Sequence, residues 1–583
     1  MTTHTSHSDT PSNNTAQENT TVSALTLQQL LTTAQQVLPH HKNTLQHMLQ
    51  DAEQAVSTEQ GALLQLPVSQ FVLDSRQLTT DAATKDIFVL LKSHTQPIEK
   101  SQQYAQAAAQ QAACIISEID PADLQLSEQD IGCPLLYVPN IRDVLGTLIQ
   151  LSLLPSSTLS QIQSTQDLLQ QLPQVIAVTG TNGKTTISQL IAQLCHLSAL
   201  PELADSAVMG TAGNGRLGSL VQASHTTGDA LAVQRFLRQM QQEGVDVLAL
   251  EASSHGLDQQ RLQGVPVKVA VYSNLSRDHL DYHPDMQDYA RAKARLFDKA
   301  YFPQLTHAII NIDDDFAPMM AKTAIDSGVK VWLYSLNPEV SVNIDGVDAL
   351  FVASSISPSL TGVEIELTVD SNSIATDSIK LHSPLLGRFN VANVLAAVAG
   401  AMALGVPLDA MPALVKQLQG ASGRMQRAES ANDDQGVFIV DYAHTPDALT
   451  QVLTSLKSHC EGKLWAVFGC GGDRDKGKRP LMAQAGLSVA DQVVLTSDNP
   501  RSEDPVLILE DMQQGMTEAQ HQKTTVIADR KQAINYVVQQ AGAQDIVVIA
   551  GKGHETYQEI KGVRYDFDDR LILQEALIEA HQG

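Results

Sequence analysis

The stretch that most constrains the fold is Val175–Leu194, which reads VIAVTGTNGKTTISQLIAQL. Its first four residues are apolar and predict a buried strand, and the residues after Lys184 have the periodicity of an amphipathic helix. Between them lie Gly180 and Gly183. A glycine loop that joins a strand to a helix presents backbone N–H groups to an anion, and a lysine adds positive charge. The stretch therefore predicts a phosphate-binding loop.

The loop matches a shortened Walker pattern, GxxGKTT. Val178 stands where the full pattern has Gly or Ala. Thr185 occupies the place where a hydroxyl group binds Mg²⁺. The alternative is a glycine turn ahead of an ordinary helix, but the strand before the loop and GKT at the helix start favour a nucleotide site with Mg²⁺.

The composition excludes several classes of protein. A formal net charge of −26 makes nucleic acid and anionic membranes unfavourable partners. The five cysteines show no CxxC spacing, which is typical of free thiols in a reducing cytoplasm. No apolar run is long enough to span a membrane, and the N-terminus lacks the pattern of a secretory signal. We therefore expect a cytoplasmic protein without membrane insertion.

The chain of 583 residues is long enough for about three or four domains. Residues 1–22 are polar and predict a disordered tail. Residues 23–172 predict a small α/β domain followed by a Ser- and Gln-rich linker. In residues 173–420 strands alternate with helices, which predicts a mostly parallel sheet, and residues 421–583 repeat this design as a doubly wound sheet. The fold class is therefore α/β with three domains.

Polar residues follow the strands of the central domain. Glu251 ends the apolar run VDVLAL, and Asn274–His283 follows VKVAVY. In a parallel sheet, ligands bind beyond the carboxyl ends of the strands, so we expect these residues to converge with the phosphate loop. A carboxylate that faces such a loop usually serves Mg²⁺. The alternative for Glu251 is an N-cap of the SSHG turn.

Two histidines and a lysine in this region are less certain from pattern alone. His279, beside Asp278, is the better metal ligand, whereas His283 is more typical of a structural group. Lys293 lies in an expected helix over Met286–Phe297, where the pattern predicts a solvated side chain.

The third domain carries basic loops after its strands. GGDRDKGKR (Gly471–Arg479) and DNPR (Asp498–Arg501) bring five basic residues towards one edge: Arg474, Lys476, Lys478, Arg479 and Arg501. In so acidic a chain these loops suggest an anionic ligand, and the planar fork of arginine suits carboxylates. The alternative, a solvated basic loop, is favoured for the lysines.

Together these motifs resemble those of the Mur ligases. The quoted motifs are TGTNGKTT, MGTAGN, HTTG, EASSHGLDQQR, NLSRDHLDYH, GRFNVANVLAA, GRMQ, DYAHTPDAL, FGCGGDRDKGKRPLM, DNPR and AGKGHE. The resemblance is closest to the type that adds meso-2,6-diaminopimelate to UDP-N-acetylmuramoyl-L-alanyl-D-glutamate, called below the UDP-muramoyl-dipeptide. It implies a uridine-nucleotide-binding N-terminal domain, a central ATPase domain and a Rossmann-like C-terminal domain.

The resemblance also implies an activity. ATP, with Mg²⁺, would phosphorylate the γ-carboxylate of the D-glutamate, and the amine of diaminopimelate would attack the acyl phosphate. The product would be a peptidoglycan precursor made in the cytoplasm, and the protein would be a monomer.

Residue roles follow from the resemblance, motif by motif. The ATP phosphates would be bound by Gly180, Thr181, Asn182, Gly183, Lys184, Thr185 and Thr186, and the rest of the nucleotide by Asn390, Asn393, Arg424 and Asp441. The UDP end would be held by Leu73, Ser75, His94, Thr95 and Gln96, and the muramoyl-dipeptide by Thr226, Thr227, Ser253, Gln259 and Arg261. Diaminopimelate would be bound by Arg474, Asp498, Asn499, Pro500, Arg501, Gly551 and Glu555. Mg²⁺ would be held by Thr185, Glu251 and His279, and the catalytic groups would be Lys184, Glu251, His279 and Lys293, the last as a carbamylated lysine.

Several alternatives stay open. DNPR and HTTG count against a lysine-adding ligase and against a folylpolyglutamate-type ligase. A regulatory P-loop ATPase would hydrolyse nucleotide without an acceptor, and a non-enzymatic scaffold would leave Lys184, Glu251 and His279 unexplained. The chain has His225 where the family often has Asn before TTG, which puts that dipeptide contact in doubt.

Overall fold

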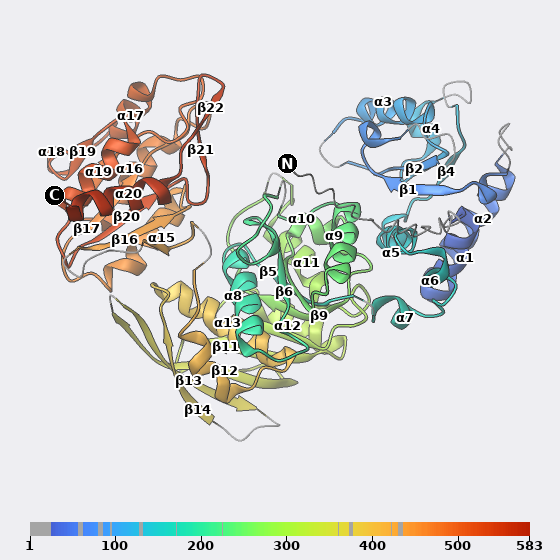
Figure 1. Cartoon of the computed structure of the whole chain (residues 1–583), viewed down its shortest axis with the longest axis horizontal. Coiled ribbons are helices and arrows are strands. Elements are labelled where there is room, and N and C mark those ends of the chain that lie inside the picture. Colours follow the sequence, from blue (N-terminus) through green and yellow to red (C-terminus); the bar gives the residue numbers. More distant parts are fainter. Residues whose placement is uncertain are drawn as a thin grey trace, which may run out of the picture. The chain divides into compact units, whose positions relative to one another are not determined.

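The computed structural model describes residues 25–55, 62–79, 85–93, 96–126, 132–170, 172–223, 226–280, 282–359, 361–371, 377–420, 423–428 and 435–582. The chain divides into two compact units, one of residues 1–141 with 148–167 and one of residues 142–147 with 168–583 (Figure 1). The predicted disordered tail, residues 1–22, lies outside the described residues. The predicted boundaries between the three domains stay predictions.

The first unit contains a parallel four-stranded sheet in the order β1-β2-β3-β4. Its strands are β1 (Val68–Val72), β2 (Lys85–Leu90), β3 (Cys114–Ser117) and β4 (Leu135–Tyr137). The helices of residues 25–170 are α1 (Leu27–Val37), α2 (Lys42–Gln54), α3 (Ile98–Ala109), α4 (Pro121–Leu124), α5 (Arg142–Ser152), α6 (Ser156–Leu159) and α7 (Thr165–Leu169). Because β1 and β2 are parallel neighbours, the segments that follow them begin at the same edge of the sheet.

The second unit contains a ten-stranded sheet in the order β14-β13-β12-β11-β10-β9-β5-β8-β6-β7. The strands are β5 (Gln174–Thr179), β6 (Ser206–Gly210), β7 (Gly213–Arg216), β8 (Val247–Glu251), β9 (Val267–Tyr272), β10 (His307–Asn311), β11 (Lys330–Ser335), β12 (Val347–Ser359), β13 (Gly362–Ser371) and β14 (Asp377–Ser383). The run from β12 through β11, β10, β9, β5 and β8 to β6 is parallel, as predicted, whereas β13, β14 and β7 pair antiparallel.

β5 lies inside this sheet with both faces covered. Ile176 and Val178 belong to one apolar cluster, and Val175 and Ala177 to the other, because successive side chains of a strand point to opposite faces. The helices of this part are α8 (Lys184–Ser198), α9 (Ala230–Gln242), α10 (Ser254–Asp258), α11 (Met286–Ala294), α12 (Ala317–Asp326), α13 (Arg388–Leu404) and α14 (Met411–Val415). Burial on both faces explains why the sequence of β5 is a continuous apolar run.

The second unit also contains a six-stranded sheet in the order β15-β16-β20-β17-β18-β19. Its strands are β15 (Gln426–Arg427), β16 (Val437–Asp441), β17 (Leu464–Phe468), β18 (Gln492–Leu495), β19 (Thr524–Val526) and β20 (Ile546–Ala550), and a separate hairpin comprises β21 (Tyr557–Ile560) and β22 (Val563–Asp566). The helices are α15 (Pro446–Lys457), α16 (Lys478–Val489), α17 (Pro505–Gln513), α18 (Glu518–His521), α19 (Arg530–Gln540) and α20 (Asp569–Gln582). All pairs except β15–β16 are parallel, so the predicted doubly wound sheet is confirmed.

The cysteines are free thiols in the structure, as the sequence predicts. Among the described residues, no helix combines the length and the hydropathy that crossing a bilayer requires.

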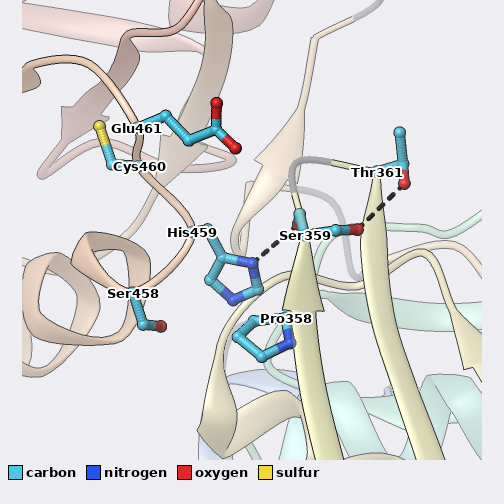
Figure 2. A pocket seen from close by; sticks show the side chains of 7 residues that line it. All are labelled: Pro358, Ser359, Thr361, Ser458, His459, Cys460 and Glu461. Atoms are coloured by element: carbon cyan, nitrogen blue, oxygen red, sulfur yellow. Dashed lines mark hydrogen bonds between the residues drawn. The ribbon is translucent and has the colours of Figure 1, made fainter.

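His459 joins the end of α15 to the long β12–β13 hairpin (Figure 2). Its side chain is 4 % exposed, and its Nδ1 lies 2.8 Å from the carbonyl oxygen of Ser359. The backbone N–H of Gly387 donates to Nε2 at 3.1 Å. Both bonds together require a neutral ring protonated on Nδ1. The small pocket beside it, lined by Pro358, Ser359, Thr361, Ser458, His459, Cys460 and Glu461, includes none of the predicted site residues.

We expect the substitution His459→Phe to lower the free energy of unfolding by about 1–3 kcal/mol, because the two buried backbone groups lose their partner. Burial lowers the pKa of His459 below its ordinary 6.5, so the unfolded chain takes up this proton at a higher pH than the folded chain. The contribution to stability is therefore complete above about pH 6.5 and declines below it. Urea unfolding at pH 7.5 and at pH 5.5 measures both effects. The exposed His382, replaced in the same way, is the control.

Candidate functional site

The phosphate loop has the backbone that the sequence predicts. Gly180 and Gly183 have φ of +150° and +87°, and α8 begins directly after Gly183. A Cβ at Gly180 would lie 1.9 Å from the Ser273 hydroxyl, and one at Gly183 would lie 2.7 Å from Asn393 Oδ1. Only glycine fits both places. The loop is thus packed directly against the segment after β9 and against α13.

Lys184 is folded back onto its own loop. Its Nζ donates to the carbonyl oxygens of Gly180 and Thr181, at 2.9 Å each. Burial lowers the pKa of this lysine, although Glu251 opposes the shift. Asn274 holds the loop from the side, because its carbonyl oxygen accepts from the N–H of Thr181 at 2.8 Å and its Oδ1 from that of Asn182 at 3.0 Å. The loop is therefore ordered by Lys184 from within and by Asn274 from the side.

Lys293 is not the solvated helix lysine that the pattern predicts. It is 1 % exposed, and its Nζ donates to the carbonyl oxygen of Gly180 at 2.9 Å. The same Nζ lies over the ring of Tyr289, 4.6 Å from the ring centroid. Burial, and then the nearby charge of Lys184, place the pKa of Lys293 well below its ordinary value. Lys293 is therefore a buried amine beside the phosphate loop, and its lowered pKa favours the uncharged form.

Glu251 lies at the carboxyl end of β8 and converges with the loop, as predicted. It is 2 % exposed and accepts from the Thr185 hydroxyl at 2.9 Å. Thr211 donates to it twice, from its N–H at 2.8 Å and from its hydroxyl at 3.1 Å. The alternative that Glu251 caps the SSHG turn is wrong, because Ser253 is the N-cap of α10. Thr211, which follows β6 in the MGTAGN motif, was missed by the sequence reasoning.

The Glu251 carboxylate has the properties of a group that binds a cation. It is buried, and the groups of Thr185 and Thr211 that donate hydrogen bonds to it are uncharged. A buried carboxylate is costly without a positive partner. Among the described residues, no group of three or more His, Cys, Asp and Glu side chains could hold a metal ion by itself. The pair Thr185 and Glu251 thus fits Mg²⁺, which takes one or two protein ligands and completes its shell with phosphates and water.

The segment after β9 forms a cluster of rings beside this site. His279 has a left-handed φ of +53° and a ring 4.9 Å from that of His255 and 5.9 Å from that of Tyr289. His283 is 1 % exposed, and its Nδ1 lies 3.0 Å from Asp288, whose carboxyl pKa this bond lowers. The buried Nε2 of His283 has no hydrogen-bond partner among the described residues. The role of His283, as a support for a ligand or as a structural group, and the metal role of His279 both stay predictions.

The residues predicted to hold the muramoyl-dipeptide form one network at the same edge. The Thr227 hydroxyl donates to the carbonyl of Glu251 at 2.7 Å, and it accepts from the N–H of Ser253 at 3.0 Å. Arg261 donates to the carbonyl of Thr227 at 3.0 Å and, through Nη2, to the side chain of Gln259 at 2.8 Å. Thr226 accepts from the Thr211 hydroxyl at 3.0 Å, and His225 lies outside the described residues.

The predicted nucleotide residues lie in two parts of the second unit, in α13 and in the segments beside β16. Asn390 and Asn393 are buried in α13, with Asn393 Nδ2 donating to Asn390 Oδ1 at 3.0 Å. Asp441 ends β16 and accepts from the N–H groups of Met425 and Ala443, at 2.7 Å each. Burial raises the pKa of Asp441 even though these bonds oppose the shift. The guanidinium of Arg424 lies 4.5 Å above the ring of Tyr442.

The predicted UDP residues lie in the first unit. Leu73 and Ser75 follow β1, and Gln96 follows β2, so they begin at the same edge of the first sheet. His94 and Thr95 lie outside the described residues.

The basic loops of the third sheet have unequal roles. Arg479 is 1 % exposed and makes ion pairs with Glu503 at 2.7 Å and Asp511 at 2.8 Å, so its prediction as an anion ligand is wrong. Lys476 is exposed beside Glu503. Arg474 is exposed. Arg501 has a left-handed φ of +51° and donates to the carbonyl of Gly472 at 2.7 Å.

The segments after β18 and β20 meet, as predicted for strands of one parallel sheet. Asn499 Nδ2 donates to Glu555 at 3.0 Å, and Gly551, with φ of +112°, places its missing Cβ 3.4 Å from Asp498 Oδ2. Pro500 precedes Arg501 in the same turn. The sequence reasoning missed Lys552, which is fully buried between these groups. Its only signal was its place in AGKGHE.

Comparison with known proteins gives family matches to both sheets of the second unit. The model of the Mur ligase middle domain matches residues 178–401, and that of the Mur ligase glutamate ligase domain matches residues 423–553. A Vibrio vulnificus protein named UDP-N-acetylmuramoyl-L-alanyl-D-glutamate–2,6-diaminopimelate ligase is 40 % identical over 524 residues, covering 88 % of this chain and 95 % of its own. A Pseudomonas aeruginosa protein of the same name is 45 % identical over 403 residues, covering 69 % of this chain and 77 % of its own.

A solved structure of a ligase with this name is also similar. It is 44 % identical in sequence, covers 90 % of this chain and 97 % of its own, and has a TM-score of 0.64.

Proposed function

The chain belongs to the Mur ligase family, and from this premise we propose that it adds meso-2,6-diaminopimelate to the UDP-muramoyl-dipeptide at the expense of ATP. The observation that carries the choice of acceptor is the turn Asp498–Arg501 beside Glu555, which offers a guanidinium and carboxylates at one place. A zwitterionic amino acid with a second carboxylate needs both kinds of group. The product is a peptidoglycan precursor, and the site of action is the cytoplasm.

The phosphate loop binds ATP. The N–H groups of residues 180–186 and the start of α8 receive the phosphates, and Lys184 exchanges its loop carbonyls for phosphate oxygens. Mg²⁺, held by Thr185 and Glu251, supplies positive charge that neutralises the phosphates. Asn390, Asn393, Arg424 and Asp441 contact the rest of the nucleotide.

The UDP-muramoyl-dipeptide is held by Thr226, Thr227, Ser253, Gln259 and Arg261, with its UDP end on Leu73, Ser75, His94, Thr95 and Gln96. Its γ-carboxylate oxygen attacks the γ-phosphorus of ATP, and ADP leaves. The neutral amine of diaminopimelate then attacks the acyl carbon, phosphate leaves with the C–O electron pair, and the ammonium loses a proton. Arg474, Asp498, Asn499, Pro500, Arg501, Gly551 and Glu555 bind diaminopimelate.

Lys293 is carbamylated in the active protein. Carbamylation consumes a neutral amine, and burial, together with the charge of Lys184, lowers the pKa of Lys293 and so favours that form. The carbamate nitrogen retains one N–H, so the bond to the carbonyl of Gly180 can persist. The new anion lies beside the phosphate loop, where it helps to hold Mg²⁺.

A panel of acceptors tests the proposal. Purified protein with ATP, Mg²⁺ and the UDP-muramoyl-dipeptide should release phosphate with meso-diaminopimelate and not without an acceptor. Release with L-lysine at an equal rate would establish a lysine-adding ligase instead. Release with no acceptor and no dipeptide would establish a regulatory ATPase.

We expect Arg501→Ala to lower kcat/KM for diaminopimelate by more than about tenfold, since one charge-assisted pair is lost. Arg501→Lys should restore little of this, because an ammonium cannot reproduce the planar fork. Phosphate release at subsaturating diaminopimelate measures the effect, with the exposed Arg291→Ala as the control. An unchanged rate would show that the second carboxylate is bound elsewhere.

A further inference from the structure

Lys552 is a fully buried lysine that contacts Asn499 and Glu555, two residues of the proposed acceptor site. It follows β20, and its Nζ lies 3.2 Å from Asn499 Oδ1 and 3.3 Å from Glu555 Oε2. The nearest oxygen of Asp498 is at 3.6 Å. A buried ammonium is costly unless it is paired, so a lysine kept here must be held by these oxygens.

The lysine fixes which way the amide of Asn499 points. Asn499 Oδ1 accepts from Lys552 and also from the backbone N–H of Glu559 at 2.9 Å. Its Nδ2 is thereby turned to Glu555, to which it donates at 3.0 Å. Glu555 Oε2 thus receives two donors, Lys552 itself and an amide that Lys552 helps to orient.

The charges around Lys552 leave a surplus of one negative charge. The other buried cation nearby, Arg530, has its charge paired with Asp569, with Nε–Oδ1 at 2.8 Å and Nη2–Oδ2 at 2.7 Å. Lys552 therefore balances only one of the two carboxylates of Asp498 and Glu555. Among the described residues, the buried Oδ1 of Asp498 has no hydrogen-bond partner, and its contact with Lys552 Nζ is an ion pair at 3.6 Å. Carboxylates whose charge is only partly balanced suit an ammonium group.

We propose that Lys552 is a positioning residue that holds Asp498 and Glu555 in the arrangement that receives an ammonium of the acceptor amino acid. This inference rests on the proposed function, because it takes diaminopimelate as the acceptor. Without the lysine, the two carboxylates repel each other, and the amide of Asn499 keeps only the Glu559 N–H as a donor to its Oδ1. If Lys552 only stabilised the fold, its replacement would change the stability and leave the affinity for the acceptor unchanged.

Steady-state kinetics of Lys552→Met distinguish these roles. We expect KM for diaminopimelate to rise by about tenfold or more, the effect of disordering a charge-assisted contact. The KM for ATP and for the UDP-muramoyl-dipeptide should change by less than about threefold, because the phosphate loop and Arg261 are not among the contacts of Lys552. Lys531→Met, which removes an exposed lysine of α19, is the matched control.

A double variant keeps the inference testable if Lys552→Met does not fold. Glu555→Gln with Lys552→Met removes two opposite charges together and so leaves the net charge of the cluster unchanged. If Lys552 acts through Glu555, the double variant should have a KM for diaminopimelate within about threefold of that of Glu555→Gln alone. A further tenfold rise would overturn the inference, as would an unchanged KM in Lys552→Met.

The wild-type protein separates the two proposals. If it releases no diaminopimelate-dependent phosphate, the proposed function fails. If it does so and Lys552→Met keeps its KM, only the positioning role fails.

Discussion

Replacing Lys293 with methionine should lower kcat/KM for ligation by about a hundredfold or more, the cost of removing one group from a preorganised charged site. The reason is the position of the amine, 2.9 Å from the Gly180 carbonyl and buried beside Lys184. Methionine has a similar length but cannot be carbamylated. Phosphate release at subsaturating UDP-muramoyl-dipeptide measures the loss. Lys299→Met, which removes an exposed lysine of the same region, should retain full activity.

The same substitution should leave the fold intact. In the wild-type protein, the pKa of Lys293 lies well below the ordinary 10.5, so folding must remove a proton that the unfolded chain keeps. In CO₂-free buffer, the stability of the wild-type protein should therefore rise with pH through the window below about 10.5, and this slope should be smaller in Lys293→Met. Thermal unfolding from pH 7 to pH 9 measures the slope. A variant that keeps most of its activity would show that no modification at Lys293 is needed.

Acetate or formate should restore part of the activity to Lys293→Ala, because the shorter side chain leaves room for a small carboxylate near the phosphate loop. Chloride at the same ionic strength is the control. Rescue by both salts would point to screening rather than to a replaced anion.

The sequence predicts much of the phosphate site because its signals are local. β5 is a continuous apolar run, the glycines follow it directly, and the helix begins at Lys184. Glu251 could be placed beside them by one general rule, that parallel strands end at a common edge. The Thr185–Glu251 bond, between residues 66 positions apart, confirms that rule here.

Burial that depends on distant packing could not be predicted in this way. Lys293 meets a carbonyl 113 positions away, and nothing in the pattern of α11 indicates that its last turn faces the phosphate loop. Arg479 and Arg501 both lie in basic loops that follow strands, and they look alike in sequence. Only the structure shows that Arg479 is neutralised by Glu503 and Asp511, whereas Arg501 lies beside the turn that offers an acceptor site.

Replacing Glu251 with glutamine should reduce ligation by about a hundredfold or more and raise the Mg²⁺ concentration needed for half-maximal activity. The side chain keeps its size, and the amide oxygen can still accept from Thr185, so the local fold should persist. What is lost is the charge that a cation beside the phosphates requires. Glu243→Gln, at the exposed end of α9, is the matched control. An unchanged Mg²⁺ requirement would place the cation elsewhere.

Gly210 tests whether the position of that carboxylate matters as well as its charge. A Cβ at Gly210 would lie 2.1 Å from Glu251 Oε1, so Gly210→Ala must displace the carboxylate while keeping its charge. If Mg²⁺ binds the carboxylate as it is placed between Thr185 and Thr211, Gly210→Ala should raise the Mg²⁺ requirement almost as much as Glu251→Gln does. If charge alone sufficed, Gly210→Ala would behave like the wild-type protein. Comparing the Mg²⁺ titrations of Gly210→Ala and Glu251→Gln therefore separates the effect of the position of the Glu251 carboxylate from the effect of its charge.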